Sequence, residues 1–548
     1  MNPFRFLPAL LATAVPVPSM AQAQAQPEPT YAERYRPQFH FTPEVNWMND
    51  PNGLVYADGE YHLFYQHNPF GNTWGHMSWG HAVSPDLVHW KHLPVALPEA
   101  DGVMAFSGSA VIDWENTSGF GQDGIPPMVA IYTGARPADG NQAQYVAYSN
   151  DRGRTWTKYA GNPVLDLDMK DFRDPSVFWY EPDEKWVMVL VRAAEHKVSF
   201  YASTDLKQWT HLSDFGPAGA TGGVWECPAL FELPVDGDPA NTRWVLQVDL
   251  NPGFVYGGSG GQYFIGHFDG TTFIPDEPEA LVPEPGSEEL APATRQAERV
   301  RWVDYGMDFY AAIPWNDVPV IDGRLIWLAW MNNWQYAEHI PTSPWRSAQS
   351  LPRTIALRTF EDGVHLVQHP VVELQRLRGR HHHLGTLSIR EGTTSLAQEG
   401  IAGKALELVA EFEPGNARAF GLKVRVGEGE ETVIGYDAKK GELFVDRTRS
   451  GDSSFHDAFA GRHAGPLPAV DGRVRFHVFV DWSSVEVFGT NGRTTITDRI
   501  FPNPESEGVA LFSEGGTTRL MSLDAWTLKA IWNRPPERVG AAAGDTSP

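Results

Sequence analysis

The sequence predicts an all-β protein in which a five-bladed β-propeller is followed by a C-terminal β-sandwich. From residue 50 onward, apolar and polar residues alternate with the period of a β-strand, and long stretches with a helical period are scarce. A turn phrase recurs at intervals of roughly sixty residues, which is typical of four-stranded propeller blades with loop insertions. The chain has 548 residues, too many for a single ordinary core, so two domains or one large repeat array are expected from its length.

Residues 1–25 resemble a secretory signal peptide. Arg5 supplies the positive end, an apolar run follows over residues 7–17, and small-x-small cleavage sites end at Ala23 and Ala25. We therefore expect secretion, to the extracellular space or the periplasm, after cleavage near Ala23 or Ala25. No later stretch has the length and apolar content of a membrane span.

The net charge is −25, which opposes binding to nucleic acid or to an anionic membrane and fits a neutral substrate. Cys227 is the single cysteine, so the chain cannot form an internal disulfide. Stability must therefore come from buried surface. The sequence makes no prediction of the oligomeric state.

The recurring phrase predicts a hairpin near the end of each blade. It combines Asp or Gly, which turn the chain, with an aromatic residue that packs back onto the core. Its copies are "SPDLVHW" from Ser84, "SNDRGRTW" from Ser149, "STDLKQW" from Ser203 and the looser "HFDGTTF" from His267.

Five segments are expected to be the first strands of the blades. They are "NDPNGLV" (49–55), "FSGSAV" (106–111), "FRDPSVFW" (172–179), "WECPALFEL" (225–233) and "DYGMDFYAA" (304–312). The first strand of each propeller blade lines the central channel. Asp50, Asp174 and Glu226, each followed closely by a proline, should therefore meet at one end of that channel.

An Asp-Pro pair is by itself an ordinary turn element. Here three acids occupy the same position, at the start of a predicted inner strand and shortly before a proline, and each has aromatic neighbours. This repetition instead favours a functional site. Three carboxylates could also bind a cation, but Arg173 would repel it and a calcium loop should carry more oxygen ligands. We therefore expect no metal and no cofactor.

Most glycoside hydrolases use two carboxylates that face each other across the glycosidic bond. Asp50 lies beside the amides of Asn49 and Asn52, which should favour its charged form and suit a nucleophile.

The other two acids are expected to differ in environment. Glu226 stands between Trp225 and Cys227, and apolar neighbours should raise its pKa and suit a proton donor. Asp174 follows Arg173, which should keep it ionised.

The motifs "WMNDPNG", "FSGS", "FRDP" and "WECP" resemble the signatures of glycoside hydrolase family 32, the β-fructofuranosidases, in the family's order over roughly residues 38–530. The resemblance implies a propeller followed by a sandwich, and a retaining double displacement. It makes Asp50 the nucleophile, Glu226 the acid/base and Asp174 the transition-state stabiliser. The residues expected to bind the fructosyl unit are Asn49, Asn52, Gln66, Trp74, Phe106, Ser107, Arg173 and Trp330.

Residues 330–353 resemble exo-acting levanases and exo-inulinases more than invertases, although Ala229 departs from relatives that place an acid after "ECP". The expected activity is release of terminal β-D-fructofuranosyl units from levan or inulin, and from sucrose. The alternatives are a fructosyltransferase that uses the same acids, a non-catalytic fructan-binding propeller, and an arabinan-cleaving propeller.

The expected domains are a propeller over residues 31–368, a link with a helical turn or two over 369–380, and a sandwich over 381–532. The polar tail, 533–548, is expected to be disordered. Asn491-Gly492 predicts a hairpin turn inside the sandwich, whose expected role is to brace the propeller. The run His381–His383 is expected to be a solvated linker and not a metal site.

Overall fold

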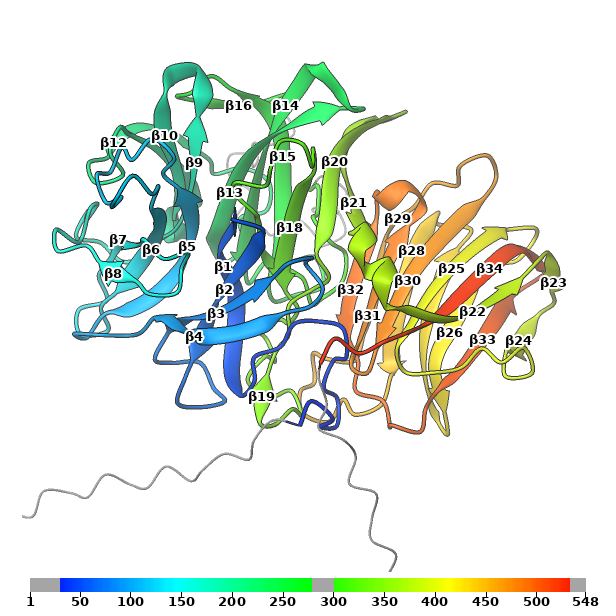
Figure 1. Cartoon of the computed structure of the whole chain (residues 1–548). Coiled ribbons are helices and arrows are strands. Elements are labelled where there is room, and N and C mark those ends of the chain that lie inside the picture. Colours follow the sequence, from blue (N-terminus) through cyan, green and yellow to red (C-terminus); the bar gives the residue numbers. More distant parts are fainter. Residues whose placement is uncertain (1–29, 278–299, 533–548) are drawn as a thin grey trace, which may run out of the picture.

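The computed structural model describes residues 30–277 and 300–532, so the expected signal peptide and C-terminal tail lie outside the described residues. Figure 1 shows two β-rich bodies side by side, the first built from residues up to 370 and the second from the rest. Within the described ranges, no helix is long and apolar enough to cross a membrane.

The first body is the predicted five-bladed propeller (Figure 1). Its first two blades are β1 (Asn46–Ala57), β2 (Glu60–Asn68), β3 (Ser78–Ser84) and β4 (Lys91–Leu97), then β5 (Met104–Ile112), β6 (Met128–Ala135), β7 (Gln142–Ser149) and β8 (Thr157–Lys158). The next two are β9 (Phe172–Tyr180), β10 (Lys185–Arg192), β11 (Lys197–Ser203) and β12 (Thr210–Phe215), then β13 (Val224–Val235), β14 (Asp238–Asn251), β15 (Gly260–Phe268) and β16 (Phe273–Pro275). The last is β17 (Tyr310–Pro314), β18 (Leu325–Trp330), β20 (Arg353–Phe360) and β21 (Gly363–Pro370).

The five inner strands form a closed ring. β1 contacts β5, β5 contacts β9, β9 contacts β13, β13 contacts β17, and β17 returns to β1. The ring is reinforced by β19 (Trp345–Arg346), which comes from the last blade and pairs in parallel with the start of β1. Four of the five predicted head segments are therefore confirmed as inner strands, and the fifth, 304–312, is confirmed only from Tyr310, where β17 begins. Apolar clusters fill the spaces between neighbouring blades.

The recurring turn phrase joins the third and fourth strands of four blades, as predicted. In each copy the aspartate accepts a hydrogen bond from a backbone N–H three or four residues on, at 2.8–2.9 Å, which holds the turn. The aspartates are Asp86, Asp151, Asp205 and Asp269.

The second body is the predicted β-sandwich. Its first sheet contains β22 (Arg378–Leu384), β23 (Leu387–Ile389), β25 (Leu406–Glu413), β30 (Val474–Asp481), β31 (Ser484–Gly489), β32 (Thr495–Arg499) and β34 (Thr518–Leu528). Its second contains β24 (Gly392–Ser395), β26 (Ala419–Gly427), β27 (Glu430–Asp437), β28 (Glu442–Arg449), β29 (Arg462–Pro466) and β33 (Gly508–Glu514). Fully buried Phe412, Phe420 and Phe476 belong to the shared core. The connection from β31 to β32 carries Asn491 and Gly492 with φ of 60° and 71°, the left-handed conformations that a tight hairpin turn requires.

The link expected over residues 369–380 is shorter than predicted, because β21 and β22 extend into it from either side. β21 continues to Pro370 and β22 starts at Arg378, so a 3₁₀ helix, Val372–Leu377, makes the connection. The expectation of a linker at residues 381–383 is wrong, because these histidines are part of β22, although the side chains of His381 and His383 are solvent-exposed as expected. His381 Nε2 and His383 Nδ1 both contact Asp524 Oδ1, at 2.8 and 2.9 Å.

Buried ion pairs join the two bodies. Arg353 of the propeller, whose side chain is fully buried, lies 2.9 Å from Asp304 Oδ2 and 2.6 Å from Glu486 Oε2 of the sandwich. His40 lies between Asp481 and Glu486, at 2.8 and 2.9 Å. Breaking one member of such a network would leave an uncompensated buried charge, so the sandwich fixes the position of the propeller strands it touches.

Candidate active site

The structure brings Asp50, Asp174 and Glu226 together around Cys227, at one end of the propeller channel. The Cys227 backbone N–H donates to Asp174 Oδ2 at 3.0 Å, and Cys227 Sγ lies 3.6 Å from Asp50 Oδ2. Asp174 and Cys227 both have positive φ, 64° and 48°, which is uncommon for residues with a side chain and often marks a functional site.

A β-bulge at the head motif directs each acid into the site. The register between inner and second strands shifts between Met48 and Pro51 in β1, between Arg173 and Ser176 in β9, and between Glu226 and Ala229 in β13. Proline has no N–H to donate to a ladder, so it is tolerated where a bulge leaves a residue unpaired. The Asp-Pro and Glu-Cys-Pro motifs therefore both interrupt the strand and aim an acid into the channel.

Asp50 is 8% exposed and is held from two sides. Ser107 Oγ donates to its Oδ2 at 2.7 Å and Asn49 Nδ2 donates to its Oδ1 at 3.2 Å. Burial, with a smaller contribution from the charge of Glu226, raises the pKa of Asp50 to about 6 although these donors oppose the shift. The expectation that donors would dominate is therefore wrong. Asn52 was expected to lie beside Asp50 and to bind the sugar. It is instead fully buried, and its amide lies within hydrogen-bond reach of Gln66.

Asp174 is the more deeply perturbed carboxyl. Burial raises its pKa to about 7, against the opposing charge of Arg173, whose Nε lies 3.7 Å from Asp174 Oδ2. The nearby Glu226 adds to the increase. Arg173 alone therefore does not keep Asp174 ionised as the sequence predicted, because desolvation outweighs one partly shared cation.

Glu226 has polar partners. Arg173 NH2 donates to its Oε1 at 3.1 Å, the hydroxyl of Tyr310 donates to its Oε2, and its side chain is 20% exposed. The expected apolar surroundings are wrong, because Trp225 turns away into the blade core and is fully buried. Glu226 is thus the acid of the three with the most contact with solvent, which suits a group that must exchange protons.

Three further residues complete the site. Tyr310 lies in the quoted head of the fifth blade, but nothing in that motif marks a hydroxyl as a partner for Glu226. Asp249 is paired in register with Glu226 across β13 and β14 and is 1% exposed, and burial raises its pKa well above the usual range. An acid inside the mostly apolar stretch "VLQVDL" was a signal for it. The third is Trp334.

The expected sugar-binding residues are placed as follows. Asn49, Ser107 and Arg173 contact the acids directly, as given above, while Gln66 Nε2 donates to the Ala105 carbonyl at 2.9 Å. Trp74 is 41% exposed, and its ring meets that of Phe106 edge-on at 5.9 Å.

The tryptophans of residues 330–353 differ from expectation. Trp330 is fully buried, so it supports the site from behind and does not form its wall. Trp334 of the same segment is partly exposed and stacks on Trp47 at 6.0 Å. Trp47 in turn donates its indole N–H to Asn49 Oδ1 at 2.7 Å, which orients the Asn49 amide toward Asp50.

The channel beneath the acids is nearly filled. The cavity there, lined by Ser107, Asp174, Cys227 and inner-strand prolines, has a volume of about 20 Å³. A sugar unit therefore cannot be accommodated on this side of the acids.

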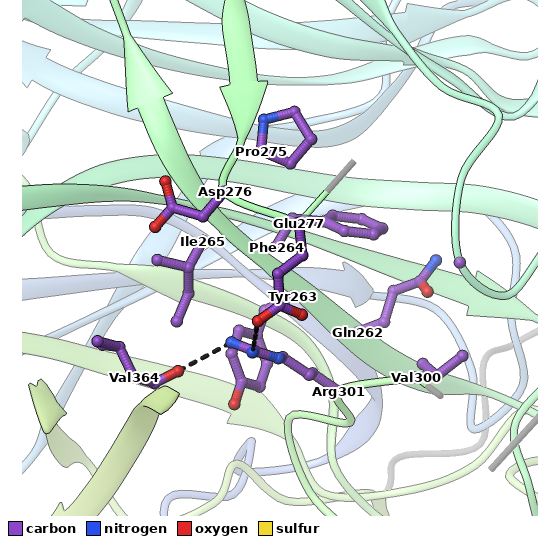
Figure 2. Close-up of a pocket in the computed structure, with 11 residues that line it drawn as sticks. Gln262, Tyr263, Phe264, Ile265, Pro275, Asp276, Glu277, Val300, Arg301 and Val364 are labelled. Atoms are coloured by element: carbon purple, nitrogen blue, oxygen red, sulfur yellow. Dashed lines mark hydrogen bonds and ion pairs between the residues drawn. The ribbon is translucent and has the colours of Figure 1, made fainter. Parts of the chain in front are cut away.

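Figure 2 shows a different pocket, on the flank of the fourth and fifth blades. Its volume is about 100 Å³, and Arg301 crosses it to donate to the Val364 carbonyl at 2.8 Å and to Glu277 Oε1 at 2.9 Å. None of the three acids lines it, and its walls end at Glu277 and Val300, where the described ranges stop. The carboxylates therefore define the candidate site, and this pocket does not.

A propeller funnel that holds three carboxylates, an arginine and exposed aromatic rings defines a carbohydrate-active enzyme of the glycosidase class. The chain matches the model of the N-terminal domain of glycosyl hydrolases family 32 over residues 40–370, and the C-terminal model of that family over residues 373–527. It belongs to this family.

Relatives and solved structures agree with this assignment. The levanase of Bacillus subtilis is 52% identical over 512 residues, which cover 92% of this chain and 72% of the levanase. An extracellular exo-inulinase of Aspergillus niger is 44% identical over 533 residues, covering 92% of this chain and 96% of that protein. The crystal structure of exo-inulinase from Aspergillus awamori superposes with a TM-score of 0.83 at 42% identity, covering 92% and 100% of the two chains.

Proposed function

We propose that this glycosidase is an exo-acting, retaining fructosidase that releases terminal β-D-fructofuranosyl units from levan or inulin and also cleaves sucrose. The observation that carries the proposal is the meeting of Asp50, Asp174 and Glu226 around Cys227 at the base of one funnel. Relatives named levanase and exo-inulinase support the choice of fructan as the substrate.

In the first step, an Asp50 carboxylate oxygen attacks C2 of the terminal fructosyl unit, and Glu226 gives its proton to the departing glycosidic oxygen. The C2–O bond to the leaving sugar breaks as the bond from C2 to Asp50 forms. In the second step, Glu226 takes a proton from water, which attacks C2 and releases fructose and the Asp50 carboxylate.

The contacts of Asp50 suit this role. Ser107 and Asn49 hold both carboxylate oxygens, so the attacking atom is fixed before substrate arrives. Asp174 does not attack. It faces the sugar hydroxyls and stabilises the positive charge that develops in the oxocarbenium-like transition state.

Two observations support the exo mode. The cavity beneath the acids holds only about 20 Å³, so a polymer cannot pass through the channel, and a site closed at this depth suits a chain end. The resemblance of residues 330–353 to exo-acting enzymes points the same way.

We further propose export after cleavage near Ala23 or Ala25. The positively charged start, apolar run and small-x-small sites support it, as does the extracellular location in the names of relatives. N-terminal sequencing of protein recovered outside the cytoplasm tests this, and an intact Met1 would contradict it.

The decisive experiment compares products from levan, inulin and sucrose in parallel. Free fructose should be the main early product from both polymers. Oligosaccharides that accumulate before fructose would indicate endo cleavage. At high sucrose, new oligosaccharides in place of free fructose would indicate a fructosyltransferase.

A further inference from the structure

The far end of the propeller channel, opposite the acids, opens into a pocket of about 770 Å³. Its walls come from the outgoing ends of β5 and β9 and from the loops that follow them. β9 has Asp174 near its start and Trp179 near its end, about 17 Å apart along an extended strand. This pocket and the candidate active site therefore lie at opposite ends of the same inner strands.

The passage between the two ends is blocked. Besides the small cavity beneath the acids, the side chain of Asn316 spans the channel and donates to the carbonyls of Ala110 at 2.9 Å and Val177 at 3.1 Å. Its backbone N–H donates to the Leu54 carbonyl at 2.9 Å, so the fifth blade is tied to the first three at this point. A ligand in the far pocket cannot reach the acids through the protein.

Two tryptophans form fixed walls of the pocket. Trp114 is 60% exposed, yet its indole N–H donates to Asp317 Oδ1 at 2.8 Å, and Asp317 Oδ2 accepts the Ile112 N–H at 2.9 Å. Trp179 donates its indole N–H to Glu181 Oε2 at 2.8 Å. Both rings are therefore oriented before any ligand binds, while the Trp114 face remains open.

The wall behind Trp179 is also rigid. The buried Trp186 meets its ring edge-on at 5.1 Å and donates to Thr117 Oγ1 at 2.9 Å. Thr117 is itself held by Asp113, which accepts hydrogen bonds from the Thr117 N–H and hydroxyl at 2.8 and 3.0 Å. The loop from 113 to 118 therefore needs little ordering when a ligand arrives.

The charge of the pocket selects the class of ligand. Among its lining side chains in the described part of the chain, acids are frequent and Lys, Arg and His are absent. An anion would be repelled. No group of acids, histidines or cysteines within the described ranges could hold a metal ion. The open indole face of Trp114 beside carboxylate oxygens instead suits a neutral sugar, whose C–H face packs on the ring and whose hydroxyls donate to the acids.

We propose that this pocket is a second, non-catalytic binding site for a neutral oligosaccharide, namely a segment of a fructan chain away from the end being cleaved. The choice of fructan rests on the proposed function. By holding the polymer, the site raises the effective concentration of chain ends at the active site, an advantage that a disaccharide cannot gain.

Trp114→Ala tests the proposal, because an exposed side chain can be removed without opening the core. Binding is measured by native electrophoresis in gels that contain levan, inulin or dextran, with Asp50→Asn as the background if the parent degrades the polymer. We expect Trp114→Ala to weaken retardation by levan or inulin at least about fivefold, the effect of losing one aromatic anchor. Trp114→Phe should retain most of it. Ile274→Ala removes an apolar side chain of similar exposure, 58%, elsewhere on the propeller and should change nothing.

Unchanged retardation of Trp114→Ala would overturn the proposal. So would equal loss by Trp114→Ala and Ile274→Ala, equal retardation by dextran, or displacement of levan by a lysine-rich peptide, which would indicate a basic partner. In the Asp50-containing chain, Trp114→Ala should slow levan hydrolysis and leave sucrose hydrolysis unchanged, whereas equal losses on both would also overturn it. A parent that is retarded by levan yet cleaves nothing would refute the proposed function alone.

Discussion

The guanidinium of Arg173 donates to the carboxylate of Glu226 across 3.1 Å. The same side chain lies 2.7 Å from Asp171 and 3.7 Å from Asp174, so a single planar cation connects three acids. Lysine has a single compact ammonium group, which cannot contact three acids at once as the planar guanidinium does.

Arg173→Lys should therefore lower kcat/KM for sucrose about 10–100-fold, as expected from losing a hydrogen bond to a charged group worth roughly 1.5–3 kcal/mol. The variant should fold, because a cation remains in place, and a thermal unfolding curve checks this. If Arg173→Lys had the kcat/KM of the parent, the positive charge alone would matter at this position, and the planar geometry of the guanidinium would not.

Glu226→Ala should lower kcat about 10²–10⁴-fold on sucrose, with a smaller effect on ground-state binding, because general acid catalysis acts in the transition state. A fructoside with a good leaving group needs less protonation and should be partly spared. Kinetics on both substrates provide the test. Equal losses would count against Glu226 as the acid.

The sequence was sufficient to predict the propeller, the sandwich and the meeting of the three acids, because these depend on strand periodicity and on repeated motifs. It was insufficient for the environments of the acids. Neighbours in sequence pointed to Trp225 beside Glu226, but side chains alternate along a strand, and the bulge at Cys227 places Arg173 and Tyr310 there instead.

Burial was the second quantity that sequence reasoning could not supply. Asn49 does donate to Asp50 as expected, yet desolvation raises the pKa of Asp50, and how deeply a carboxyl is buried depends on blades that are distant in the chain. The same holds for Trp330, which was expected to line the pocket but is fully buried beneath residues from other segments.

Asp174→Asn should make the protein more stable at neutral and alkaline pH. The folded-state pKa of Asp174, about 7, lies above the usual value for an unfolded chain, so the folded protein binds more protons than the unfolded one between about pH 4 and 7. The stability that this group contributes is complete below pH 4 and is lost as the pH rises through 7.

Asparagine does not titrate, so the gain in unfolding free energy should be of the order of a few kcal/mol at pH 8 and should shrink toward pH 4. Thermal or denaturant unfolding at both pH values measures it. The same variant should lose most of its activity, a trade-off that is common at active sites. A variant less stable than the parent at pH 8 would refute the argument.

Ser107→Ala should shift the acid limb of the pH profile. The pKa of Asp50 is raised to about 6, and the Ser107 hydroxyl opposes that increase by donating to the charged form. Removing the donor should raise the pKa further, so the acid limb of kcat/KM should move to higher pH. Asn49→Asp, which replaces a donor with a second acid, should move it in the same direction. An acid limb unchanged in Ser107→Ala would mean that Asp50 does not control it.

Asp50 should form a covalent fructosyl-enzyme. It should lie about 5–5.5 Å from Glu226, the carboxyl separation of retaining enzymes, and not the ~6.5–9.5 Å that leaves room for an inverting water. Two inversions at C2 then give net retention, so the fructose released first should be the β anomer. Asp50→Asn keeps the shape and removes the charge, and should give a folded, sugar-binding protein with almost no activity.

NMR of fresh product, recorded before mutarotation, tests the role of Asp50 directly. A β anomer that appears first, together with an inactive Asp50→Asn and an impaired Asp174→Asn that still forms β product, would agree with attack by Asp50. The variants should differ because the role proposed for Asp174 is to stabilise the transition state without bonding to C2. If α-fructose appeared first, a single inversion would have occurred, and Asp50 would have to act as a general base on water or serve only to interrupt β1 at its bulge.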